Sequence, residues 1–156
     1  MIRLFAFVLL ILTGPALADD VQYRNSRFGT TAVLPADFRA SPAPTNGDGR
    51  SFSHPVLRGT VSVYGAHNIA GDRLADYRDY LTGIYLDSGQ SITYQAGGNS
   101  WFVLSGWDGD EIYYLRAEGC TGGPVHHIYF SFPGSEKPRW EPIIERYARK
   151  LDGPCQ

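Results

Sequence analysis

The segment that decides the fold is WFVLSGWDGDEIYYLR, residues 101–116. Two runs rich in aromatic and β-branched residues, 101–107 and 110–116, flank Asp108-Gly109. Asp-Gly between two such runs is a strong β-hairpin signal, because both residues accept the backbone angles of a tight turn. We therefore predict a pair of antiparallel strands here and place the rest of the chain around it.

Five other segments have the composition of strands. Residues 91–95 and 125–132 lie on either side of the hairpin in sequence, and each is followed by glycine or proline. Earlier in the chain, residues 28–34 form an expected strand, and residues 50–54 pair with 59–65 around a turn. The chain has no internal repeat and no long linker, so we expect a single antiparallel sheet.

Two amphipathic helices are predicted. The first has Asp72 as its expected N-cap and an apolar stripe spaced by three, four and three residues, formed by Leu74, Tyr77, Leu81 and Ile84. The second holds Pro138 and Pro142 in or before its first turn, and its stripe is formed by Trp140, Ile143, Ile144, Tyr147 and Leu151. The order of strands, helix, antiparallel meander and helix predicts an α+β fold, an antiparallel sheet packed with two main helices.

The segment NGDGRSF, residues 46–52, suggests either a cation-binding loop or a turn before a strand. An EF-hand register places Pro44 at the first ligand position and Pro55 at the twelfth, where calcium needs carboxylates. Asn-Gly and Asp-Gly are also strong turn dipeptides. We therefore predict a turn, and no metal site, because the sequence also lacks HxH, HExxH and CxxC motifs.

The first residues, MIRLFAFVLLILTGPALA, have the pattern of a signal peptide: one charge at Arg3, an apolar run and a terminal A-x-A. The apolar run is shorter than the roughly 20 residues that span a bilayer. We expect cleavage after Ala18 and a periplasmic or secreted protein without stable membrane insertion. The remaining residues, 19–156, have the size of a single α+β domain.

Charge excludes one class of partner. Loss of Arg3 changes the formal net charge from −2 to −3, since 13 basic and 16 acidic residues remain. No basic cluster is available to bind phosphates, so nucleic acid is not an expected partner. No cofactor motif is present either, and we expect no cofactor.

The two cysteines, Cys120 and Cys155, are separated by 35 residues. In an oxidising compartment an even cysteine count predicts a disulfide, which would attach the C-terminal tail to the sheet. The alternative is a metal or redox pair, but there is no CxxC spacing and no histidine within a few residues of Cys155.

Several motifs carry a family resemblance: YRNSRFG at 23–29, LPADF at 34–38, NGDGRSF, the 101–115 hairpin and EPIIERYARKLDG at 141–153. With these motifs the chain resembles a group of uncharacterised exported proteins of α-proteobacterial type. Their layout is similar to the PsbP-like fold, shared by the extrinsic photosystem II P subunit and the Ran-binding Mog-type import factors. The resemblance implies an α/β/α sandwich and a binding or accessory role, because its motifs are structural.

Aromatic residues are the main candidates for a binding site. Neighbouring predicted strands carry Trp101, Trp107 and Tyr113, and His127 lies on the last strand. If these side chains are exposed together, they form a platform for a protein or glycan. The alternative is that this face of the sheet is covered and belongs to the core.

Two functions remain open from the sequence. The first is an exported, non-catalytic binding or accessory protein of the bacterial cell envelope, whose partner is another envelope protein or a small ligand. The second is a small periplasmic hydrolase in which His126 or His127 acts with a nearby carboxylate. Because adjacent strand residues point to opposite faces, these two histidines cannot share one site.

Overall fold

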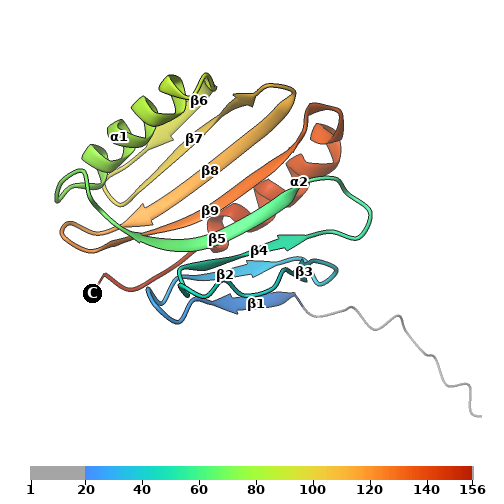
Figure 1. Cartoon of the computed structure of the whole chain (residues 1–156), viewed down its shortest axis with the longest axis horizontal. Helices are drawn as coiled ribbons and strands as arrows, with labels where there is room; N and C mark the ends of the chain where they lie inside the picture. Colours follow the sequence, from blue (N-terminus) through green and yellow to red (C-terminus); the bar gives the residue numbers. More distant parts are fainter. Residues whose placement is uncertain (1–19, 156) are drawn as a thin grey trace, which may run out of the picture.

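The computed structural model describes residues 20–155. The predicted signal peptide, residues 1–18, and the predicted mature N-terminus at Asp19 lie outside the described residues. Seven strands form one antiparallel sheet in the order β3-β4-β5-β9-β8-β7-β6 (Figure 1). In that order their bounds are Arg39–Ala40, Gly49–Ser53, Thr60–His67, Pro124–Pro133, Glu111–Gly119, Trp101–Asp108 and Ser91–Gly97. This arrangement, with its two helices, confirms the predicted α+β fold.

The deciding hairpin forms as β7 and β8. Asp108 pairs with Glu111, so the turn is Gly109-Asp110, one residue later than the predicted Asp108-Gly109. Gly109 has a φ of 61°, a left-handed conformation that glycine adopts without a steric penalty. The 50–54 and 59–65 hairpin is also confirmed, as β4 and β5.

Two elements were missed by the sequence analysis. Strand β1 (Val21–Arg24) pairs with β2 (Thr31–Leu34) in a separate two-stranded ribbon, and β3 is a two-residue strand at the edge of the sheet. Strand β2 is the C-terminal half of the predicted 28–34 strand. The preceding residues form a turn instead, in which the Asn25 side chain accepts a hydrogen bond from the Phe28 amide.

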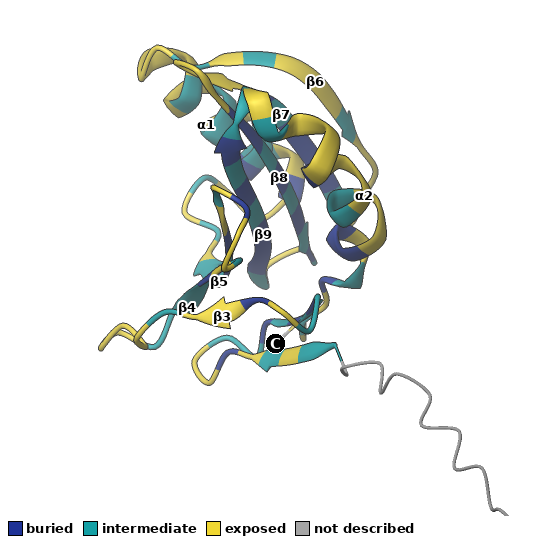
Figure 2. Cartoon of the chain, turned by 90° about the vertical axis from the view of Figure 1, so that its right-hand side faces the viewer, coloured by how far each residue is buried: buried dark blue, intermediate teal, exposed yellow. Residues whose placement is uncertain are grey.

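Strand β9 lies at the centre of the sheet, between β5 and β8, and is buried on both faces (Figure 2). Ile128, Phe130 and Phe132 belong to one hydrophobic cluster, whereas Val125 belongs to the other. Alternate residues of a strand point to opposite faces, so β9 contributes to two cores at once.

The first core lies under helix α2 (Lys137–Tyr147) and the β1–β2 ribbon. The short 3-10 turns η1 (Gly134–Glu136) and η2 (Ala148–Lys150) flank this helix. Trp140 is fully buried, its ring stacks on Phe132 at 5.1 Å, and its indole N–H donates to the Arg58 carbonyl. Pro138 lies in the first turn as predicted, but Pro142 lies inside the helix.

The second core lies under helix α1 (Leu74–Asp87), which covers the β6–β7 end of the sheet (Figure 1). Leu74 and Tyr77 are buried as predicted. Ile84 is 39% exposed, however, and Tyr85 takes its place against the sheet. The N-cap is Arg73 rather than Asp72, and it makes no side-chain capping bond.

The predicted disulfide between Cys120 and Cys155 is confirmed, with the two Cα atoms 5.4 Å apart. It joins the loop after β8 to the C-terminal tail. The tail is also held by backbone hydrogen bonds between Asp152 and Thr31, in both directions.

We expect the Cys120→Ser, Cys155→Ser double variant to unfold at lower denaturant concentration than the oxidised protein. Closing a loop across a sequence separation of 35 residues reduces the entropy of the unfolded chain and stabilises by about 3.8 kcal/mol. Urea titration followed by tryptophan fluorescence measures the difference. A reductant should destabilise the native protein and leave the double variant unchanged; equal stability with and without the bond would contradict this account.

Candidate functional site

The two helices cover different halves of the sheet. Helix α1 packs on β6 and β7, and its first turns also cover β8 and the 125–127 end of β9. Within residues 20–155, no helix packs on this face over β4 or over most of β5. Helix α2 and the β1–β2 ribbon pack on the other face at β9 and its neighbours, and leave that face of β6 and β7 open. Each face of the sheet therefore has one half that is covered by a helix and one half that has no helix above it.

The open half beside α1 contains a groove of about 610 Å³. We call it the tyrosine groove: its lining includes Tyr64 from β5, Tyr129 from β9 and Tyr85 from the end of α1. Ser51 and Ser62 also line the groove, together with residues of the loop before β4 and the first residues of that strand. The volume is within the range of about 300–1,000 Å³ that is typical of small-molecule sites.

The groove presents hydroxyl groups and little free charge. Ser51 and Ser62 share a hydrogen bond of 2.8 Å. In the wall, Asp48 is paired with Arg27 at 2.6 Å, and the Arg50 side chain donates to the Ser41 carbonyl. The Asp48 carboxylate is therefore neutralised within the protein, whereas Arg50 has this hydrogen bond but no ion-pair partner among residues 20–155.

The three groove tyrosines keep their protons at neutral pH. Burial raises the pKa of the Tyr64 and Tyr85 hydroxyls, and the neighbouring tyrosines add to the effect. Burial also raises the pKa of Tyr129 to about 12. Within residues 20–155, the tyrosine hydroxyls that bond to protein atoms are those of Tyr113 and Tyr147. The three groove hydroxyls remain available as neutral donors.

Two of the predicted site residues, His127 and Tyr113, are buried and pack against the rings of these tyrosines. His127 is fully buried and stacks on Tyr64, with centroids 4.3 Å apart and an interplanar angle of 8°. Tyr113 is 1% exposed; it stacks on Tyr129 and meets Tyr85 edge-on at 5.1 Å. Neither residue can touch a ligand in this conformation, but each supports the ring of a groove tyrosine.

The other two predicted residues lie on the opposite face. Trp101 and Trp107 pair with Glu118 and Ile112 of β8, at the two ends of β7. Trp107 is 39% exposed, and Trp101 is partly buried. The structure therefore does not bring Trp101, Trp107, Tyr113 and His127 together on one surface, and ligand binding by these residues stays a prediction.

Neither histidine forms the pair that a hydrolase would require. His126 lies between the Thr30 hydroxyl, 2.7 Å from Nδ1, and the Pro154 carbonyl, 2.9 Å from Nε2. Since a carbonyl only accepts, Nε2 carries the proton and Nδ1 accepts from Thr30. The His127 nitrogens have no hydrogen-bond partner among residues 20–155. In the described part of the chain, the structure gives neither imidazole a carboxylate partner.

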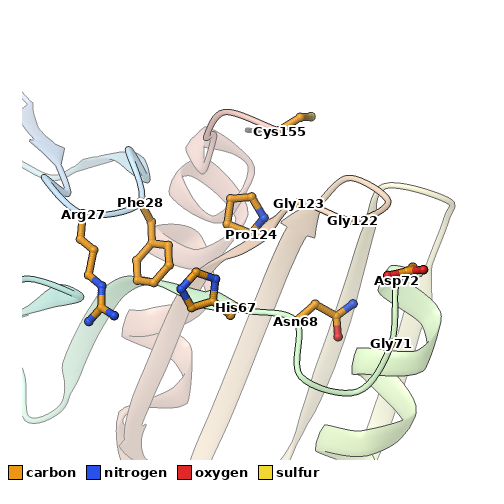
Figure 3. A pocket seen from close by; sticks show the side chains of 10 residues that line it. All are labelled: Arg27, Phe28, His67, Asn68, Gly71, Asp72, Gly122, Gly123, Pro124 and Cys155. Carbon is orange, nitrogen blue, oxygen red and sulfur yellow. The ribbon is translucent and has the colours of Figure 1, made fainter.

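A second cavity, of about 620 Å³, lies at the end of the sheet beside the disulfide (Figure 3). Figure 3 shows Phe28 next to His67, with Arg27 and Asp72 toward opposite ends. Two of its polar side chains are engaged: Arg27 binds Asp48, and the Asn68 side chain donates to the Arg73 carbonyl and accepts from the Ala70 amide. The His67 and Asp72 side chains have no hydrogen bond or ion pair among residues 20–155. We favour the tyrosine groove because it brings three phenol rings together.

Metal-ligating residues do not gather in the described structure. No group of three or more His, Cys, Asp or Glu side chains within residues 20–155 is arranged to hold a metal ion. The NGDG segment forms a turn as predicted, with Gly47 at a φ of 69° and its amide donating to the Pro44 carbonyl.

The groove could not be predicted from the sequence, although two of its tyrosines lie on predicted strands. Tyr64 falls in the predicted strand 59–65 and Tyr129 in the predicted strand 125–132, but the alternation of side chains does not show which face stays open. Tyr85 fell outside the predicted helical stripe. Recognising the groove needed the position of α1 on the sheet, which no local pattern specifies.

Comparison with known proteins supports the fold. No protein-family model matches the chain, and no curated protein sequence matches it. Among solved structures, cyanobacterial PsbP from Synechocystis is similar with a TM-score of 0.65, at 10% identity, over 90% of this chain and 96% of that chain. The Ran-binding protein Mog1p of Saccharomyces cerevisiae has a TM-score of 0.62, at 8% identity, over 87% of this chain and 96% of that one.

A protein from Bacteroides thetaiotaomicron also matches, with a TM-score of 0.51 and 13% identity, over 89% of this chain and 49% of that chain. At these identities the likeness shows the fold alone. The chain therefore has the PsbP-like and Mog1-like α+β fold that its sequence motifs implied. No helix within residues 20–155 has the length and apolar character needed to cross a membrane.

We expect His127 to make the protein less stable in mild acid. Burial lowers the pKa of His127 from 6.5 to about 3. Between pH 6.5 and pH 3 the unfolded chain binds a proton at this histidine and the native protein does not. The free energy of unfolding therefore decreases as the pH is lowered, by about 1.4 kcal/mol for each pH unit below the unfolded pKa.

Urea titrations at pH 7 and pH 5 test this, using His127→Phe, which keeps an aromatic ring against Tyr64 without a titrating group. The variant should lose less stability than the native protein between the two pH values. His67→Gln, at an exposed position, is the control and should behave like the native protein. An unchanged pH dependence in His127→Phe would refute the assignment.

Proposed function

We propose that this chain is an exported, non-catalytic binding protein whose tyrosine groove holds a neutral carbohydrate. The observation that supports it is a groove of small-molecule size lined by three tyrosines whose hydroxyls have no partner among residues 20–155. Export is proposed from the leader-like residues 1–18, which lie outside the described residues.

The chemistry of the groove favours a carbohydrate. Sugars present apolar C–H faces and a ring of hydroxyl groups, and tyrosine offers an apolar ring with a polar tip. Tyr64, Tyr85 and Tyr129 supply both, and the Ser51–Ser62 pair adds further hydroxyl groups to the lining. The Asp48 carboxylate is paired with Arg27, and Arg50 donates to the Ser41 carbonyl, so its remaining N–H groups can donate to the hydroxyl oxygens of a sugar.

A binding role is also consistent with the state of the tyrosines. Phenols with raised pKa values stay protonated and act as hydrogen-bond donors rather than as bases or nucleophiles. Mog1p, which shares this fold, is described as Ran-binding, so a binding role has a precedent in this architecture. A protein partner at the groove is the alternative occupant.

We expect at least one neutral hexasaccharide to bind the purified, oxidised protein in isothermal titration calorimetry, among cellohexaose, maltohexaose, laminarihexaose and xylohexaose. Tyr85→Phe and Tyr129→Phe, which remove one hydroxyl each and keep the ring, should each weaken binding about three- to tenfold. That range corresponds to the loss of one hydrogen bond.

Tyr94→Phe is the matched control, because Tyr94 does not line the groove and is 55% exposed on β6. It should bind as the native protein does. If none of the four oligosaccharides binds, or if Tyr94→Phe weakens binding as much as Tyr85→Phe does, the groove is not a carbohydrate site.

A further inference from the structure

Strand β6 forms one edge of the sheet, next to β7 only. Its sequence, SITYQAG, contains no charged residue and no proline, and most of its residues are exposed (Figure 2). An edge strand exposes unpaired backbone N–H and C=O groups, and natural proteins usually protect a long edge with charge or proline. The opposite edge, β3, has only two residues, one of them Arg39. Within residues 20–155, β6 has a bulge between Ile92 and Tyr94 and helix α1 packed on one of its faces, but no strand paired along its outer edge.

Beside this edge lies a cavity of about 310 Å³ on the face that α2 leaves open. We call it the aromatic–arginine pocket; it is lined by Tyr94, Trp101, Val103, Tyr114, Arg116 and Arg149. Tyr94 belongs to both features, since it lies on β6 and lines the pocket. Any strand added to β6 would therefore place alternate side chains next to the pocket.

The pocket carries a net positive charge. The Arg116 guanidinium stacks over Trp101, 4.7 Å from the ring centroid, and pairs with Glu118 at 2.7 Å. Arg149 is exposed, and none of the ion pairs within residues 20–155 includes it. Tyr114, Arg116 and Arg149 line the same pocket. Burial raises the pKa of the Tyr114 hydroxyl, and the positive charges of Arg116 and Arg149 oppose that shift.

We propose that the β6 edge and the aromatic–arginine pocket together dock an extended acidic segment of a partner protein. The segment pairs with β6 as an added strand, so its backbone satisfies the free edge. One of its carboxylates enters the pocket and binds Arg149, where a planar guanidinium can form paired hydrogen bonds. The aromatic rings exclude water around this contact.

This site is independent of the tyrosine groove. Tyr94, Trp101 and Tyr114 lie on the face of α2, whereas the groove lies on the face of α1. The proposed ligands also differ, since the groove is proposed to hold a neutral carbohydrate and the pocket an acidic segment. Success or failure of one proposal leaves the other unaffected.

The test uses a fluorescein-labelled octapeptide in which glutamate alternates with valine, titrated with the oxidised protein and followed by fluorescence anisotropy. We expect binding that Arg149→Ala weakens about tenfold, because a hydrogen-bonded charge pair is lost. Arg149→Lys should retain part of the affinity. Arg146→Ala, which removes the same charge from an exposed position outside the pocket, should change it less than about twofold.

Amide hydrogen exchange should show slower exchange in Ser91–Gly97 when this peptide is bound. The proposal is overturned if Arg149→Ala binds as well as the native protein, or if a lysine–valine octapeptide binds equally. Unchanged exchange in β6 would also overturn it. Protection of β6 that depends on protein concentration without peptide would instead assign the edge to a second copy of the chain.

Discussion

The burial of β9 on both faces is the constraint on which the rest of the structure depends. A strand with apolar side chains on both sides needs a covering layer above and below the sheet. Helix α1 supplies one layer and helix α2, with the β1–β2 ribbon, supplies the other. Even the two adjacent histidines of β9 follow this rule: His126 lies toward Thr30, just before β2, and His127 lies toward Tyr77 of α1.

Two short helices cannot cover a seven-stranded sheet completely, and here they cover it unevenly. The two open halves have different chemistry. One half carries three protonated tyrosines and a pair of serines, and the other carries aromatic rings with the guanidiniums of Arg116 and Arg149. Buried residues are part of both surfaces, since the His127 ring stacks against Tyr64 and Val103 lines the pocket. The same packing that stabilises the sheet therefore fixes the geometry of both candidate sites.

The sequence predicted most of the fold because its signals were local. The Asp-Gly hairpin, the proline and glycine boundaries and the two apolar stripes each depend on a few neighbouring residues. The site was harder to predict because it depends on which way each strand and helix faces. Ile84 and Tyr85 both continue the helical spacing from Leu81, and only the packing of α1 on the sheet selects Tyr85. Similarly, Tyr113 and Tyr114 are equivalent as sequence, yet one supports the groove and the other lines the pocket.

The uneven cover of the sheet is tested most directly by hydroxyl-radical footprinting read by mass spectrometry, which reports the exposure of individual aromatic side chains. Tyr113 is 1% exposed under α1, and Tyr94 is 55% exposed on the open half of the other face. The account predicts rapid oxidation of Tyr94 and protection of Tyr113 in the native protein, with similar rates after unfolding. Equal oxidation of the two residues in the native protein would contradict it.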